Sequence, residues 1–192
     1  MKRIAAGSVD FVIAADAGLV SLEKLGVKPD LIVGDFDSLG YVPTGPKVIQ
    51  HPVHKDASDL ELALDEAAAR GFDAALVCGA LGGRVDHTMA AIHACARFAE
   101  SGRNVAMVGE DEMLKILVGP GTYDLPAIEQ GTVSVFSATE KAIGVTERGL
   151  EYPLDDAVIT NRTTLGLSNE LVGKPASISV EQGTLYIFHP IY

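Results

Sequence analysis

The sequence predicts an α/β N-terminal domain with a mostly parallel sheet, followed by an all-β, sandwich-like C-terminal domain. In the first half, short apolar runs alternate with stretches of helical periodicity, which is typical of strand–helix–strand units. Beyond about Val118 the helical periodicity disappears, and short alternating runs follow that are punctuated by glycine and proline. We therefore expect two domains, residues 1–118 and residues 119–192, with the boundary near Gly119.

The composition excludes several classes of protein. The chain has 192 residues, of which 47% are hydrophobic, so it has ample material for a core. The formal net charge of −11 argues against nucleic-acid binding and against a basic membrane-binding patch. Cys78 and Cys95 do not form a metal-spaced pair, and no apolar run approaches the roughly 20 residues that span a bilayer. We expect a cytoplasmic protein with buried free thiols.

The first two predicted strands, Lys2–Ala6 and Asp10–Ala15, are separated by only three residues. A parallel crossover needs about a dozen residues or more. Either the first segment lies outside the sheet or the chain is shortened here, and the sequence leaves both readings open.

A strand–helix–strand unit follows. The apolar run that ends at Ala15 leads into a short helix with leucines at helical spacing, which Gly26 is expected to close, and the strand Leu31–Val33 comes next. This order implies a parallel sheet. Asp16 and Asp35 therefore both follow the carboxyl ends of strands, where open α/β sheets bind their ligands.

The turn Gly34–Ser38 carries Asp35 and Asp37 one residue apart, and both are expected on the same side of the chain. Carboxylates this close repel each other unless a cation lies between them, and Mg²⁺ is the usual cation. The alternative is an ordinary Asp-rich turn that caps the next segment.

A second acidic cluster precedes a predicted helix. Ser58 and Glu61 fit a capping box, and an apolar stripe continues to about Arg70. On one reading, Asp56 and Asp59 only stabilise the start of this helix, because negative charge near a helix N-terminus interacts favourably with the helix dipole. On the other reading, Lys55 beside them makes a mixed-charge site that suits phosphate and metal.

The predicted strand Ala74–Cys78 runs into a glycine-rich turn, Gly79–His87, and a helix from about His87 to Ser101 follows. Free N–H groups and the helix dipole make such a turn a natural anion site, although the P-loop ending is missing. Arg84 would supply a fork for phosphate, and Asp86 would cap the helix or join the acidic residues. Spacing alone favours His87 as a helix residue rather than a metal ligand.

The second half is predicted to contain short strands joined by turns. Gln182-Gly183 looks like a hairpin turn, and the polar segment Thr163–Leu171 is interpreted as an interstrand loop. The predicted strands are Gly121–Leu125, Thr132–Ser137, Ala142–Val145, Ala157–Thr160, Ser177–Val180 and Thr184–Phe188.

Five stretches, taken in order, resemble the thiamine pyrophosphokinase family, whose members transfer pyrophosphate from ATP to thiamine. They are Ala15–Gly18, Gly34–Ser38, Lys55–Asp59, Gly82–His87 and Leu167–Glu170. Ala17 stands where the family usually has Gly, and Ser58 where it often has Thr. The N-terminal connection is also shorter, and the absence of tryptophan leaves Phe or Tyr for any aromatic contact with thiamine.

The resemblance implies a Mg²⁺-dependent enzyme in which the thiamine hydroxyl attacks the β-phosphorus of ATP and AMP leaves. It implies a homodimer whose subunits share the site. The implied catalytic residues are Asp35, Asp37, Asp56, Asp59 and Arg84, of which the four aspartates would hold the metal and Asp59 is the candidate proton acceptor. The implied nucleotide-binding residues are Asp16, Lys55, Ser58, Gly82, Gly83, Arg84, Asp86 and His87. The implied thiamine-binding residues are Leu167, Ser168 and Asn169.

Two other functions compete with this interpretation. Asp35-Phe36-Asp37-Ser38 also fits the aspartyl nucleophile motif of haloacid-dehalogenase-type phosphatases, but that fold does not predict the β-rich second half. A non-catalytic module that binds thiamine or a nucleotide is favoured only by the short N-terminal connection. AMP production would distinguish the enzyme from both.

Overall fold

The computed structural model describes residues 9–44, 47–54 and 56–192. The chain divides into two compact units, Met1–Phe72 and Asp73–Tyr192, and each is described here by itself. The predicted strand Lys2–Ala6 and the predicted phosphate ligand Lys55 lie outside the described residues.

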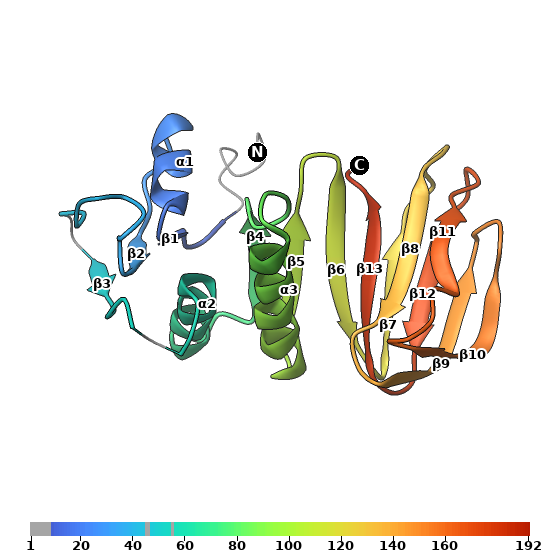
Figure 1. The fold of residues 1–192 in the computed structure, drawn as a ribbon. Coiled ribbons are helices and arrows are strands. Elements are labelled where there is room, and N and C mark those ends of the chain that lie inside the picture. Colours follow the sequence, from blue (N-terminus) through green and yellow to red (C-terminus); the bar gives the residue numbers. More distant parts are fainter. Residues whose placement is uncertain (1–8, 45–46, 55) are drawn as a thin grey trace. The chain divides into compact units, whose positions relative to one another are not determined.

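Within its described residues, the first unit contains a three-stranded parallel sheet in the order β1-β2-β3 (Figure 1). The strands are β1 (Ile13–Ala15), β2 (Leu31–Gly34) and β3 (Val48–Gln50), and the helices are α1 (Gly18–Lys24) and α2 (Asp59–Ala69). Both faces of β2 are buried, since Ile32 packs with Leu19 of α1, whereas Leu31 and Val33 pack with Ala63 of α2. Burial on both faces explains the uninterrupted apolar run of this strand.

Two predicted helix ends are confirmed. The Ser58 hydroxyl accepts a hydrogen bond from the Glu61 backbone N–H at 3.2 Å, which caps α2 at its N-terminus. Gly26 has a φ of 68° just beyond α1, and the Val27 N–H donates to the Leu22 carbonyl across this turn. Both contacts belong to the standard capping geometries.

The second unit is built from two sheets, with strand orders β11-β8-β13-β6-β5-β4 and β10-β9-β12-β7. The helix α3 (Val85–Glu100) packs against β5 and β6. The strands are β4 (Ala74–Cys78), β5 (Asn104–Val108), β6 (Glu112–Val118), β7 (Gly121–Leu125), β8 (Thr132–Ser137), β9 (Lys141–Arg148), β10 (Leu154–Thr160), β11 (Gly166–Glu170), β12 (Ala176–Val180) and β13 (Thr184–Pro190).

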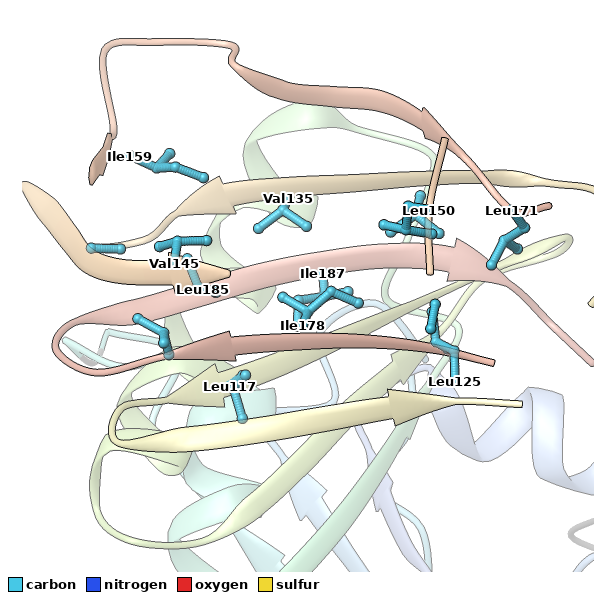
Figure 2. Packing of buried hydrophobic residues seen from close by; sticks show 14 residues of the cluster. Leu117, Leu125, Val135, Val145, Leu150, Ile159, Leu171, Ile178, Leu185 and Ile187 are labelled. Carbon is cyan, nitrogen blue, oxygen red and sulfur yellow. The ribbon is translucent and has the colours of Figure 1, made fainter. Parts of the chain in front are cut away.

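The main core of this unit takes residues from both sheets. Val133 and Val135 of β8 are at most 1% exposed, and so are Leu185 and Ile187 of β13. Figure 2 shows Val135, Ile178 and Ile187 among the side chains that converge in this cluster. Buried residues at every second position are typical of strands with one face on a core.

The strand β6, which the sequence interpretation missed, pairs with β5 on one side and with β13 on the other. Strands from both sides of residue 119 thus belong to one sheet. Parallel pairing is confirmed within β1–β3 and between β4 and β5, but β5 and β6 are antiparallel. The reversal between them was overlooked because it spans only Gly109–Asp111, where the Gly109 N–H donates to the Glu112 carbonyl.

Two local predictions are wrong. Gln182-Gly183 is not a hairpin turn, because β12 and β13 belong to different sheets and the chain crosses between them here. A Cβ at residue 183 would lie 2.6 Å from the Lys141 carbonyl oxygen, so glycine is needed for the close approach. The supposed loop Thr163–Leu171 contains β11, whose polar residues suit a strand at the edge of a sheet.

The described residues contain no helix long and apolar enough to span a lipid bilayer.

Candidate functional site

Three carboxylates form a compact acidic group at the carboxyl ends of β1 and β2. Each of Asp16, Asp35 and Asp37 offers a ligand oxygen, and these oxygens lie within 4.8 Å of one another. The parallel register of the two strands sets Ala15 opposite Val33. The Asp16 N–H then donates to the Val33 carbonyl at 2.8 Å, so the pairing continues one residue past β1.

The turn after β2 is shaped by a glycine and a buried phenylalanine. A Cβ on Gly34 would lie 3.1 Å from Asp16 Cα and 3.2 Å from the Phe36 ring, so glycine permits the close approach of the two chains. Phe36 is 2% exposed and has a φ of 64°, which is rare for a bulky side chain. Phe36 is buried against Ala14, Leu19 and Ile32, and this packing fixes the turn that carries Asp35 and Asp37 on either side of it.

The acidic group fits a divalent cation. The Ser38 hydroxyl donates to one carboxylate oxygen of Asp16. The other, Oδ1, is buried and has no hydrogen-bond partner in the described part of the chain. A buried carboxylate oxygen without a partner is unfavourable, and its two carboxylate neighbours add repulsion. A hard cation such as Mg²⁺, which prefers carboxylate oxygens, would relieve both.

The structure thus joins Asp16, predicted as a nucleotide ligand, to the predicted metal ligands Asp35 and Asp37. The other two predicted metal ligands, Asp56 and Asp59, do not belong to any such group of three among the described residues. Asp56 is exposed and Asp59 lies in the first turn of α2.

Sequence reasoning missed two residues that lie just past the carboxyl ends of β2 and β3. Ser38 hydrogen bonds to Asp16, and the His51 N–H donates to the Gly34 carbonyl at 2.9 Å just past β3. The signal for both was their position beside or directly after a strand end.

The glycine-rich turn of the second unit lies between β4 and α3, as predicted. Gly82 and Gly83 have φ values of 92° and 74°, a region that other residues adopt rarely. Because α3 begins at Val85, Asp86 and His87 lie in its first turn. The Asp86 carboxylate accepts from the His87 N–H at 3.0 Å.

Arg84 forms a bidentate ion pair with Asp86, in which Nε donates to Oδ1 at 3.1 Å and Nη2 donates to Oδ2 at 2.6 Å. The Arg84 hydrogen bond is the main cause that lowers the pKa of Asp86 to about 2. Both side chains are exposed, so the pair is open to exchange. A polyphosphate would compete with Asp86 for the same guanidinium fork.

The predicted thiamine-binding residues lie on the edge strand β11. The β8–β11 pairing shifts between Gly166 and Asn169, and Ser168 within this bulge has a φ of 60°. A Cβ on Gly166 would lie 2.3 Å from the Val135 carbonyl oxygen. The bulge leaves Leu167 and Ser168 exposed, whereas Asn169 is buried.

The Asn169 side chain is fully engaged within the protein. Its Oδ1 accepts from the backbone N–H groups of Tyr152 and Glu170, at 3.0 and 2.9 Å. Its Nδ2 donates to Glu147 Oε2 and to the Tyr152 carbonyl, both at 2.8 Å. These four bonds use the full capacity of an amide side chain. Asn169 therefore braces β9, β11 and the segment at Tyr152.

Sequence reasoning also missed Glu147, which is 0% exposed on β9. The available signal was the alternation of the strand, which places residue 147 on the same inward face as Val145.

We predict that Mg²⁺ raises the thermal unfolding midpoint of this protein, and that Asp37→Asn abolishes most of that rise. The substitution removes one ligand and some repulsion, so the metal-free variant should unfold at or above the wild-type temperature. Thermal unfolding at increasing Mg²⁺ concentration measures both effects.

Glu23→Gln, in the last turn of α1 away from the acidic group, removes the same charge and serves as the control. It should keep the wild-type response to Mg²⁺. An unchanged Mg²⁺ response in Asp37→Asn would remove Asp37 from the metal site.

Two family models match the chain. The model described as the thiamin pyrophosphokinase catalytic domain covers residues 4–107, and the model described as the thiamin pyrophosphokinase vitamin B1 binding domain covers residues 122–185. The first range includes the acidic group and the glycine-rich turn, and the second includes Glu147 and the edge strand β11.

Individual relatives agree with these matches. The thiamine pyrophosphokinase of Bacillus subtilis (strain 168) is 29% identical over 180 residues, which span 90% of this chain and 84% of the relative. The crystal structure of the enzyme of that name from Bacillus subtilis superposes with a TM-score of 0.85 at 27% identity, covering 97% of this chain and 91% of that chain. The thiamin pyrophosphokinase from Candida albicans, at 18% identity and a TM-score of 0.78, covers 100% of this chain and 86% of that chain and shows the shared fold alone. The resemblance seen in the sequence is confirmed, and the chain belongs to the thiamine pyrophosphokinase family.

Proposed function

We propose that this chain transfers pyrophosphate from ATP to the hydroxyl group of thiamine, in a Mg²⁺-dependent reaction that yields thiamine diphosphate and AMP. The observation that carries the proposal is the acidic group of Asp16, Asp35 and Asp37, which lies within the range matched by the catalytic-domain model. Carboxylates gathered at the carboxyl ends of parallel strands suit a metal-bound polyphosphate.

Asp35 and Asp37 would hold Mg²⁺ with Asp16, and Asp56 and Asp59 stay in the proposal as further acidic ligands. When bound, the metal neutralises charge on the polyphosphate. In the transfer, the thiamine hydroxyl oxygen forms a bond to the β-phosphorus while the bond to the oxygen bridging the α- and β-phosphorus breaks. AMP leaves with that oxygen, and a carboxylate, for which we propose Asp59, accepts the hydroxyl proton.

The nucleotide would be bound by positive charge and backbone N–H groups. Arg84 would exchange Asp86 for phosphate oxygens, and Lys55 would contact a second phosphate. Gly82 and Gly83 would let the phosphates approach the backbone closely. The remaining proposed nucleotide-binding residues are Asp16, Ser58, Asp86 and His87.

For thiamine binding we propose Leu167, Ser168 and Asn169, which lie within the range matched by the vitamin B1 binding model. Because the Asn169 side chain is already fully hydrogen bonded within the protein, it would contribute by holding its neighbours in place. Thiamine carries a positive thiazolium ring, and the net charge of −11 favours its approach.

We also propose that the active enzyme is a cytoplasmic homodimer whose subunits share each site, without nucleic-acid or membrane partners. The free thiols of Cys78 and Cys95 are consistent with a reducing compartment, although Cys78 is exposed rather than buried as expected.

The domain boundary near Gly119 remains a proposal, which the gap between the two matched ranges supports.

The proposed function predicts AMP release from ATP and Mg²⁺ only when thiamine is present, with thiamine diphosphate formed in equal amount. Chromatographic separation of the nucleotides and thiamine esters measures both products. Release of inorganic phosphate instead would favour the phosphatase interpretation. Binding of thiamine and ATP without turnover would favour a non-catalytic module.

Arg84→Ala and Ser168→Ala should separate the two substrates. We expect Arg84→Ala to raise the KM for ATP at least tenfold, since hydrogen bonds to a charged group contribute about 1.5–3 kcal/mol. Ser168→Ala should raise the KM for thiamine and leave that for ATP nearly unchanged. Steady-state kinetics with each substrate varied in turn measures the two effects.

Arg84→Lys is the matched control, because it keeps the positive charge but loses the bidentate guanidinium group. Its KM for ATP should lie between those of Arg84→Ala and the wild type. If Arg84→Ala left the KM for ATP unchanged, Arg84 would not be a phosphate ligand.

A further inference from the structure

A cavity of about 250 Å³ opens beside the edge strand β11 in the second unit. Its walls are mainly apolar and include Tyr152, Leu154, Leu165 and Leu167. For scale, a cavity of roughly 150 Å³ in another protein holds a benzene molecule. The cavity therefore has room for one small aromatic ring with substituents.

Glu147 places a buried carboxyl group at the lining of this apolar cavity. Its side chain is 0% exposed, and its Oε2 accepts the Asn169 hydrogen bond at 2.8 Å. The second carboxylate oxygen, Oε1, is buried and has no hydrogen-bond partner among the residues that the structure describes. Burial raises the pKa of Glu147, and the Asn169 hydrogen bond opposes that rise.

A buried acceptor without a hydrogen-bond partner is unfavourable, and more so when it is charged. The Asn169 amide cannot relieve it, because all four of its hydrogen-bonding positions are occupied. A ligand that places an N–H donor at Oε1 would satisfy this oxygen and favour the ionised carboxylate.

We propose that Glu147 Oε1 accepts a hydrogen bond from the exocyclic amino group of the thiamine aminopyrimidine ring, which lies in the cavity; this rests on the proposed function. Among the groups of thiamine, only the amino group and the hydroxyl carry a hydrogen on nitrogen or oxygen. The hydroxyl must reach the β-phosphorus of ATP, so the amino group is the one available to Glu147.

The surroundings suit this role. Tyr152, Leu165 and Leu167 are 62%, 59% and 52% exposed, so these walls are free to adjust around a ring. The segments that carry Glu147 and Asn169 are joined at the Leu150–Leu171 bridge, and Figure 2 shows these two leucines at one end of the core. In this arrangement Asn169 is a positioning residue that acts through Glu147.

The test compares thiamine with the analogue that carries oxygen in place of the pyrimidine amino group. For the wild-type enzyme, the KM for thiamine should be at least tenfold lower than the KM for this analogue. In Glu147→Gln, the amide oxygen keeps the Asn169 hydrogen bond and an N–H₂ group takes the place of Oε1. We therefore expect the KM for thiamine to rise at least tenfold, the KM for the analogue to fall, and kcat for thiamine to change little.

Glu170→Gln is the matched control, because the same chemical change is made on an exposed residue of β11. It should keep the wild-type ratio of the two KM values. A Glu147→Gln variant with the wild-type ratio, or with both KM values raised equally, would overturn the proposal, because a purely structural role would affect both substrates alike.

Wild-type enzyme offers a second test that needs no variant. The aminopyrimidine alcohol alone should compete with thiamine, and it should inhibit at least tenfold more strongly than its oxygen counterpart. Equal inhibition by the two compounds, or no competition, would contradict the proposal. Failure of the proposed function is distinguishable, since it would appear as absent thiamine-dependent AMP in the wild type.

Discussion

The close approach of two parallel strand ends is the constraint on which the candidate site depends. Gly34 lets the backbone at Asp16 come within contact distance, and the buried Phe36 fixes the turn that carries Asp35 and Asp37. Three carboxylates are thereby held within 4.8 Å of one another, an arrangement that is unfavourable without a cation. The sheet, the glycine and the phenylalanine together maintain this acidic group against its own repulsion, which is typical of a functional site rather than of a stabilising one.

Much of this arrangement could be predicted from the sequence, because its signals are local. The cap at Ser58, the helix end at Gly26 and the acidic pair Asp35 and Asp37 each depend on a few neighbouring residues. The participation of Asp16 depends on strand register, which periodicity alone does not give. Likewise, the place of β6 beside β13 could not be predicted, because this pairing joins segments about 70 residues apart.

The second unit shows the same division between local and non-local information. The sequence singled out Ser168 and Asn169, but it did not show that the Asn169 amide is occupied by Tyr152, Glu170 and Glu147. Strand alternation predicts which face a residue occupies, whereas its hydrogen-bond partner follows only from the packing of β9 against β11. The two units thus share one feature, a buried carboxylate oxygen without a protein partner, in Asp16 and in Glu147.

Diffraction from crystals of this protein grown with Mn²⁺ in place of Mg²⁺ tests directly whether the acidic group of Asp16, Asp35 and Asp37 binds a divalent cation. Anomalous scattering locates the ion independently of any activity. We predict a peak bounded by carboxylate oxygens of Asp16, Asp35 and Asp37. An ion held by other residues, or no ion beside these carboxylates at a Mn²⁺ concentration that supports turnover, would show that the acidic group is not the metal site.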